Sequence, residues 1–383
     1  MDLTRLLASR GAVRATAALI VVSLCGSLAA VATHDASGHE IRSTGARVPA
    51  PVITTTTATT LPPTTTTTAP TTTVEPTTTQ PPITEAAITE PPAPPPTEPP
   101  ADVVTSITPA PPLAAPGTFT FVPYMGLGTW IDVYDWSETY GGGAVGLADI
   151  DRMASLGVQT LYVQATRWDA ATPVLEPERL VSLMNRARSN GMHVVAWYLP
   201  DLGDVNDDMQ RLSAIAGLPI DGLAIDIESR KVEDVDDRNQ RLLSLSAWLR
   251  ERLPGQVLSA IVLPPVVMED VNPNYWPGYP WAGLAPYYDV WQPMSYWTNR
   301  LSSSGWRDAY AYTATNIDRI RAHIGQPDAV VHTIGGIGDA STPEDVGGMV
   351  QAASDRGCIG GSLYDYRTTG DELWPGLQGL RGP

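Results

Sequence analysis

The chain is poor in cysteine, histidine and lysine, and each shortage excludes a class of protein. Its 383 residues hold two cysteines, Cys25 and Cys358, too far apart in the sequence to suggest a disulfide framework. The five histidines form no set with metal-ligand spacing, so we expect neither a metal nor another cofactor. We expect His193 and His332, in apolar strand-like runs, to be hydrogen-bonded core residues. Lys231 is the only lysine, and the net charge of −17 argues against a nucleic-acid partner.

Aromatic residues are absent from the first third of the chain, because every Trp, Tyr and Phe follows residue 117. Three arginines precede an apolar run from Ala15 to about Ala32, which indicates a signal peptide or an N-terminal membrane anchor over residues 1–33. Either would place the rest of the chain outside the cytoplasm, at the cell surface or beyond it. Residues 34–116 contain a Thr/Pro-rich tract without apolar periodicity, which predicts a disordered stalk. Membrane contact is expected only through the first segment.

Residues 117–383 alternate between apolar β-rich runs and amphipathic helical segments. The eight runs are Thr129–Tyr134, Thr160–Ala165, His193–Leu199, Gly222–Ile227, Leu258–Leu263, Val290–Tyr296, Val330–Ile334 and Ile359–Tyr364. The helical segments include Ala148–Leu156, Pro177–Ser189, Asp237–Arg252, Ala311–Ile324 and Pro343–Asp355. This alternation predicts an α/β fold, a monomeric (β/α)8 TIM-type barrel. The alternative, an open doubly wound sheet, would show a Gly-rich phosphate loop after its first strand. The Gly126-Leu127-Gly128 segment lacks that spacing and is expected to precede the strand.

Two acids in the fourth run are the strongest candidates for chemistry. Asp226 and Glu228 are two residues apart, so a strand projects both from one face. Carboxylates are costly in a buried strand unless they have partners, whereas an acid/base site needs such a pair. In a barrel the site would lie at the C-terminal ends of the strands. The structural alternative is an ion pair with Arg230 or Arg167.

Other polar and aromatic residues fall at the ends of predicted strands. They are Asp132, Gln164, Arg167, Trp168, Trp197, Gln292, Met294, Tyr296, Trp297 and Asp365. Aromatic rings pack on the apolar faces of sugar rings, and acids and amides bind hydroxyl groups. The set therefore predicts a polysaccharide substrate. For Trp168 and Trp297, ordinary packing at the barrel rim stays an open alternative.

The segment from Asp221 to Glu228, DGLAIDIE, resembles the strand-four signature DGxDxDxE of glycoside hydrolase family 18, the chitinase family. Gln292–Trp297 resembles that family's strand-six M-x-Y segment, and Gly360–Leu363 resembles the start of its strand-eight segment. The resemblance implies a secreted or surface-anchored, retaining glycoside hydrolase that acts on an N-acetylhexosamine polymer such as cell-wall glycan or chitin. Its implied catalytic residues are Glu228 as general acid, Asp226 as the group that orients the substrate acetamido nucleophile, and Tyr296 as a hydrogen-bond partner of that group.

Two further observations keep alternatives open. Ala224 stands where family 18 has its first Asp, which favours a non-catalytic glycan-binding barrel. The segments Trp130–Val133 and Gly157–Thr166 are similar to the opening of family 25 lysozymes, in which Asp132, Asp226 and Glu228 would match acidic positions. Both families act on N-acetylhexosamine polymers, so the resemblances agree on the substrate class.

Overall fold

The computed structural model describes residues 119–382. The predicted signal or anchor segment (1–33) and the predicted stalk (34–116) lie outside the described residues. Within residues 119–382, no helix combines the length and the apolar character needed to cross a membrane.

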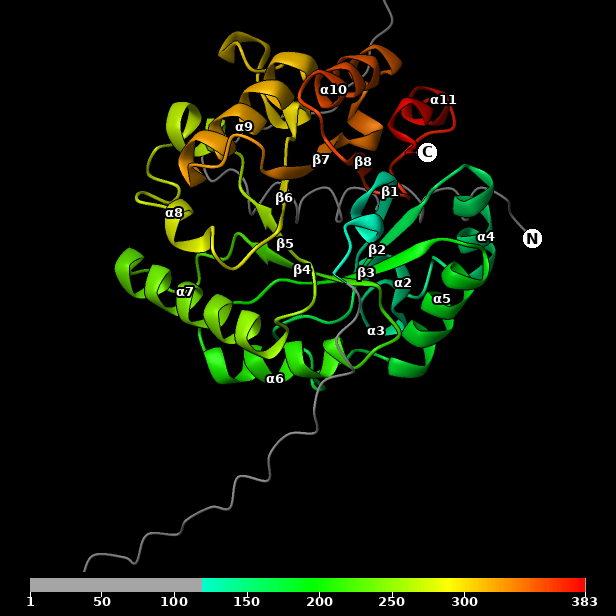
Figure 1. Ribbon diagram of the computed structural model, residues 1–383. Coiled ribbons are helices and arrows are strands. Elements are labelled where there is room, and N and C mark those ends of the chain that lie inside the picture. The colour runs from blue at the N-terminus through cyan, green and yellow to red at the C-terminus, as the bar shows by residue number, and fades with distance from the viewer. Residues whose placement is uncertain (1–118, 383) are drawn as a thin grey trace, which may run out of the picture. The chain divides into compact units, whose positions relative to one another are not determined.

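Eight parallel strands close into a barrel in the order of the sequence (Figure 1). The strands are β1 (Gly126–Ile131), β2 (Thr160–Gln164), β3 (His193–Tyr198), β4 (Gly222–Ile227), β5 (Leu258–Val262), β6 (Val290–Pro293), β7 (Val330–Ile337) and β8 (Gly360–Tyr364). The barrel closes where Gly126 and Leu127 of β1 pair with Gly360 and Gly361 of β8. The prediction of a (β/α)8 barrel is confirmed.

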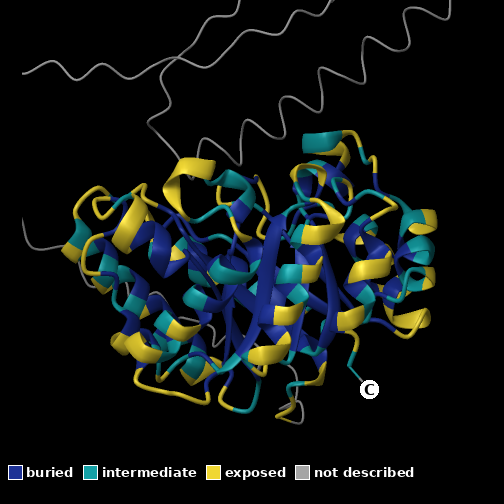
Figure 2. Cartoon of the chain, turned by 90° about the horizontal axis from the view of Figure 1, so that it is seen from above, coloured by how far each residue is buried: buried dark blue, intermediate teal, exposed yellow. Residues whose placement is uncertain are grey.

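Helices surround the barrel and cover its outer face. The longer ones are α4 (Leu147–Ser155), α5 (Pro177–Ser189), α6 (Val205–Ala216), α7 (Val235–Arg252), α9 (Ala309–Ile324) and α10 (Pro343–Asp355). The shorter ones are α2 (Val133–Trp136), α3 (Glu138–Gly141), α8 (Trp281–Leu284) and α11 (Trp374–Leu377). Figure 2 shows buried strands in the centre and helices whose outer surfaces are exposed. This pattern is what amphipathic segments around an apolar sheet produce.

The connection between β5 and β6 differs from the others. It contains a π-helical turn, Val267–Val271, and the four residues of α8, but no long helix. Tyr275, Trp276 and Tyr279 fill this connection and are buried. An irregular segment rich in aromatic residues therefore covers the barrel here, whereas a long helix covers it after most other strands.

The first strand begins three residues earlier than predicted, so Gly126-Leu127-Gly128 lies within β1 and not before it. The cause is the crowded barrel interior. A Cβ atom at Gly128 would lie 2.6 Å from the Tyr162 ring and 3.2 Å from His332, so the strand needs glycine there. Tyr134, predicted in the strand, lies instead in α2, because the Asp132 side chain caps that helix by accepting from backbone amides.

The two histidines predicted in the core differ in their environment. His332 is fully buried, and its ring lies 2.9 Å from the Tyr124 carbonyl and 3.2 Å from the Ser362 hydroxyl, which confirms the prediction for this residue. For His193 the prediction is wrong. It is the first residue of β3, its side chain is 39% exposed, and its Nδ1 lies 3.9 Å from Asp221. A strand's first residue lies at the edge of the barrel, where the apolar pattern no longer implies burial.

Tyr124, which lies just before β1, connects the start of β4 to the residue before β5. Its hydroxyl accepts from the Leu223 amide at 2.9 Å and lies 2.9 Å from the Val257 carbonyl, both buried. We expect Tyr124→Phe to lower the free energy of unfolding by about 1–3 kcal/mol, because buried backbone groups would lose their partner. Denaturant unfolding measures the change. Tyr287→Phe, at a half-buried ring, should shift stability by less than about 0.5 kcal/mol. Equal losses in both variants would contradict this role of the hydroxyl.

Candidate active site

Strand β4 carries the acidic pair to the C-terminal end of the barrel. Asp226 is paired in register with Ile261 of β5, and Ala224 with Trp197 of β3. Alternation along the strand places Ala224, Asp226 and the following Glu228 on the inward face. Asp226 is 7% exposed and Glu228 is 8% exposed, so both carboxylates are close to fully buried.

Neither carboxylate of this pair is held by a cation. Among the ion pairs of residues 119–382, none involves Asp226 or Glu228, and Asp226 Oδ1 is a buried oxygen without a hydrogen-bond donor. Arg167 pairs instead with Asp169 at 2.8 Å, and Arg230 lies over the Tyr275 ring at 4.4 Å. The structural alternative to chemistry, an ion pair with one of these arginines, is not formed.

Burial sets the proton affinity of the pair. It raises the pKa of Glu228 to about 7. It also raises the pKa of Asp226 well above the usual range of a carboxyl group, and the neighbouring Glu228 charge adds to that effect. Two carboxyl groups this close titrate as a unit. The pair therefore keeps a proton near neutral pH, as a general acid must.

The raised pKa predicts a cost in stability that depends on pH. Folding raises the pKa of Glu228 from an ordinary 4.5 to about 7, so the folded chain binds more protons in this interval and stability falls as pH rises through it. Glu228→Gln removes the ionisation. We expect it to raise the free energy of unfolding by up to about 3 kcal/mol at pH 8 and by almost nothing at pH 4. Denaturant titrations at both pH values test this, and a gain of equal size at the two would contradict it.

Aromatic side chains form a layer near the acidic pair. Trp130 lies 6.1 Å from Trp197 and 6.5 Å from Tyr364, measured between ring centroids, and Tyr296 lies 5.9 Å from Tyr364. Tyr296 and Met294, which follow β6, are buried like the acids. The strand-end residues of β1, β3, β6 and β8 thus meet in one layer.

Trp168 and Trp297, for which ordinary packing was the alternative to sugar binding, differ in their exposure to solvent. Trp168 is 38% exposed in the loop that follows β2, and the Lys231 ammonium lies 4.2 Å from its ring centroid. Trp297 is fully buried, and a Cβ atom at Gly336 would approach its ring to 2.8 Å. Trp168 therefore offers a ring to solvent, whereas Trp297 packs against the glycines of β7.

The predicted polar contacts are engaged within the protein. The Gln164 side-chain oxygen accepts from the Val133 amide at 3.1 Å, and that of Gln292 accepts from the Ser259 hydroxyl at 2.6 Å. Gln292 is fully buried inside the barrel. These amides hold the strand ends in place, and a contact with sugar stays a prediction for them.

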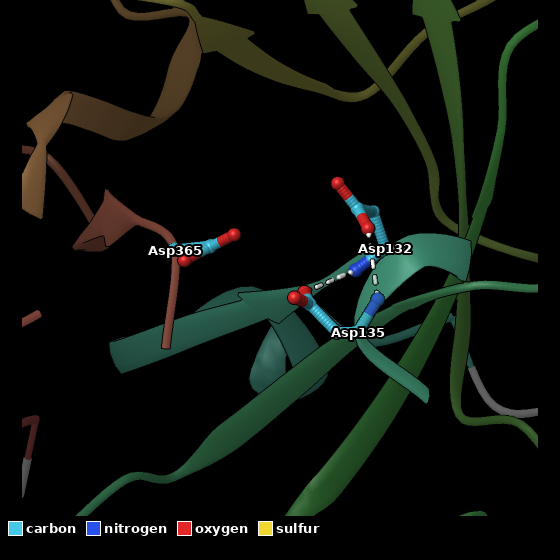
Figure 3. Close-up of side chains that lie close together, drawn as sticks. All are labelled: Asp132, Asp135 and Asp365. Atoms are coloured by element: carbon cyan, nitrogen blue, oxygen red, sulfur yellow. Dashed lines mark hydrogen bonds between the residues drawn. The ribbon is translucent and has the colours of Figure 1, made fainter. Parts of the chain in front are cut away.

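A second acidic cluster lies at the ends of β1 and β8 (Figure 3). It joins Asp132, Asp135 and Asp365, with carboxylate oxygens within 4.8 Å of one another. Burial raises the pKa of all three, to about 6 for Asp365. Repulsion from the neighbouring carboxylates adds to the effect for Asp135 and Asp365. Asp132 accepts from the Tyr364 hydroxyl at 3.0 Å, and Asp135 pairs with Arg367 at 3.3 Å.

Such a set of oxygens has the chemistry that hard cations prefer. Here the backbone amides of α2 and of the β8 connection occupy oxygens of Asp132, Asp135 and Asp365, so the hydrogen bonds account for the cluster. Sequence reasoning included Asp132 and Asp365 but missed Asp135. The Asp-x-x-Asp spacing of a helix cap was the available signal.

The barrel is structurally similar to chitinases with eight-stranded parallel barrels. The C-terminal domain of a protein described as a chitinase, from Desulfitobacterium hafniense, matches with a TM-score of 0.51 and 15% identity, over 67% of this chain and 99% of that one. A family 18 chitinase from Cycas revoluta matches with a TM-score of 0.49 and 12% identity, over 66% and 98%. No protein-family model and no curated protein matches the chain. The expected structural similarity to family 18 is confirmed, and a similarity to family 25 is not shown.

Proposed function

We propose that the barrel is a retaining glycoside hydrolase that cleaves an N-acetylhexosamine polysaccharide, with Glu228 as its general acid. One observation carries the proposal: a buried, proton-retaining pair of carboxyl groups, Asp226 and Glu228, at the catalytic end of a (β/α)8 barrel with no cation to neutralise it. A structural role would require a partner to offset the cost of burial.

Each member of the pair has a distinct task in this reaction. Glu228 donates its proton to the glycosidic oxygen as the bond to the leaving sugar breaks. The carbonyl oxygen of the substrate's acetamido group attacks the anomeric carbon, and Asp226 orients that group and stabilises its developing positive charge. The Tyr296 hydroxyl binds the same group. Water then attacks the anomeric carbon and opens the cyclic intermediate, and Glu228 takes up the proton that this water loses. Two successive displacements at the anomeric carbon retain its configuration.

The surroundings of the pair suit a sugar chain. The Trp168 ring is 38% exposed and offers a platform for one face of a pyranose, beside the Lys231 ammonium. Trp197, which pairs with Ala224, and Tyr296 supply buried aromatic surface. The basic and apolar N-terminal sequence supports an activity outside the cytoplasm. Cell-wall glycan and chitin are then the accessible polymers of this class.

A non-catalytic glycan-binding barrel is the second candidate, and Ala224 favours it. This methyl group lies one inward position below Asp226, where it gives the Asp226 carboxylate no hydrogen bond, and Asp226 Oδ1 is left without a donor. A carboxylate with one face unsupported would be oriented less strictly, and turnover would be slower or absent.

The deciding experiment is hydrolysis of cell-wall glycan and chito-oligosaccharides by the wild-type protein and by Glu228→Gln. New reducing ends and a first product of retained configuration, seen by proton NMR, are expected only for the wild type. Equal rates for the two proteins would overturn the assignment. Glycan binding without turnover in both would establish the binding barrel instead.

A further inference from the structure

Two arginines that follow β4 in the chain lie on neighbouring aromatic rings. Arg230 follows β4, and its guanidinium carbon is 4.4 Å from the Tyr275 ring centroid. Arg238 lies in the first turns of α7, and its guanidinium carbon is 4.2 Å from the Trp276 ring centroid. Tyr275 and Trp276 are consecutive residues of the β5–β6 connection. This connection therefore brings together two cations from different segments.

Neither guanidinium has an anionic partner. Within residues 119–382, Arg230 and Arg238 form no ion pair, although Arg238 is only 3% exposed and its Nε is buried without an acceptor. The next arginine on the same helix, Arg241, binds Asp237 at 2.8 Å. The chain has a net charge of −17, so it has many carboxylates. These two arginines therefore lack an acidic partner because of where they lie, and not because acids are scarce.

The nearby acids do not neutralise this pair of cations. Asp234 caps α7 by accepting from the Asp237 amide, and Asp237 pairs with Arg241. Burial lowers the pKa of Arg238, and the positive charge of Arg230 lowers it further, so the two guanidiniums repel each other. For Arg238, the cation–π contact returns only part of what it costs to bury a charge, whereas Arg230 is exposed. A bound anion would supply the missing interaction.

The two arginines adjoin the catalytic end of the barrel. Arg230 is two residues beyond Glu228, so their Cα atoms are at most about 7 Å apart. A sugar chain that is bound at the acidic pair would therefore pass close to the backbone that carries Arg230. The two guanidiniums contact the Tyr275 and Trp276 rings, and a guanidinium can bind both oxygens of a carboxylate.

We propose that Arg230 and Arg238 form an anion subsite that binds a carboxylate carried by the sugar chain. The inference rests on the proposed function for its glycan ligand and narrows the substrate class. The polymer would be an acidic N-acetylhexosamine glycan, in which some sugars bear a carboxyl group, and not a neutral chitin.

Binding to three oligosaccharides tests the subsite. We would use the full-length protein with Glu228→Gln, so that no ligand is consumed, and titrate it by calorimetry. The probes are chitotetraose, a tetrasaccharide that alternates N-acetylglucosamine with N-acetylmuramic acid, and the methyl ester of the latter. We expect the free acid to bind at least ~10-fold more tightly than its ester, the effect of one charge-assisted hydrogen bond. Adding Arg230→Gln should remove that difference and leave chitotetraose binding unchanged.

Matched variants separate the subsite from general charge effects. Arg252→Gln removes an arginine near the other end of α7, which lies 5.4 Å from the Trp248 ring, and should leave all three affinities unchanged. Arg238→Lys keeps the buried charge but loses the planar fork, and should weaken binding of the free acid alone. The subsite is overturned if acid and ester bind equally, if Arg230→Gln weakens chitotetraose as much as the acid, or if no oligomer binds. A wild-type protein that shows this binding but hydrolyses nothing would overturn the hydrolase and leave the subsite standing.

Discussion

Glu228→Gln should lower the rate of glycan hydrolysis by about 10²–10⁴-fold, the usual contribution of a positioned general acid. Glutamine matches glutamate in shape and can still donate a hydrogen bond, but it cannot give up a proton to the leaving oxygen. The Michaelis complex should therefore form normally, so kcat falls and KM changes little. Release of reducing ends from chito-oligosaccharides and from cell-wall glycan measures the change.

The matched control is Glu233→Gln, five residues along the chain at an exposed position. It removes the same charge from the same loop region, and we expect it to leave the rate of hydrolysis unchanged. A loss of similar size in both variants would show that net charge near the barrel mouth, and not proton donation, governs the rate. Unfolding curves of both variants show whether either effect comes from misfolding.

The rate of hydrolysis should also fall about tenfold for each pH unit above pH 7. A general acid works in its protonated form, and burial raises the pKa of Glu228 to about 7. Because Asp226 and Glu228 titrate together, the pKa read from the fall in rate at high pH belongs to the pair and not to one residue. Measuring kcat from pH 5 to pH 9 gives the profile. Circular dichroism over the same range shows whether the fold persists.

The opposite profile would carry a different meaning. A rate that rises with pH through this range would mean that Glu228 acts in its deprotonated form, as a general base. A rate that stays constant to pH 9 would mean that proton donation by Glu228 does not limit hydrolysis. Oligosaccharide binding by Glu228→Gln should not follow this profile, because the variant keeps only Asp226 of the two coupled carboxyl groups. A binding constant that follows the wild-type rate profile would contradict the assignment to Glu228.

Local sequence patterns were enough to predict the strands and longer helices that form the barrel. Runs such as His193–Tyr198 and helices such as α5 and α10 carry their own signals, namely β-branched content, amphipathic spacing, caps and stops. The position of β1 could not be predicted in this way. Its glycines discourage a strand locally, and only the rings of Tyr162 and His332 across the barrel explain them.

The acidic pair could also be predicted from a local pattern, because both acids belong to one strand segment. Contacts between segments that are far apart in the sequence could not be predicted in this way. Asp135 meets Asp365 across 230 positions of sequence, and Arg238 meets Trp276 only because the β5–β6 connection folds back onto α7. The Asp-x-x-Asp spacing in α2 gave a hint for the first, whereas nothing in the sequence indicated the second. Sequence patterns thus predicted the strand that carries the acidic pair, and tertiary packing determined its surroundings.

The irregular β5–β6 connection has a consequence for how this barrel can diverge. A long helix between two strands constrains substitutions on every turn, because each turn packs on the sheet and on both neighbouring helices. Here much of the covering is done by Tyr275, Trp276, Tyr279 and Trp281, outside any long helix. Evolution can therefore exchange or lengthen this segment without disturbing the strand ladder. Among homologous barrels, the length and sequence of this segment should vary more than those of the strands.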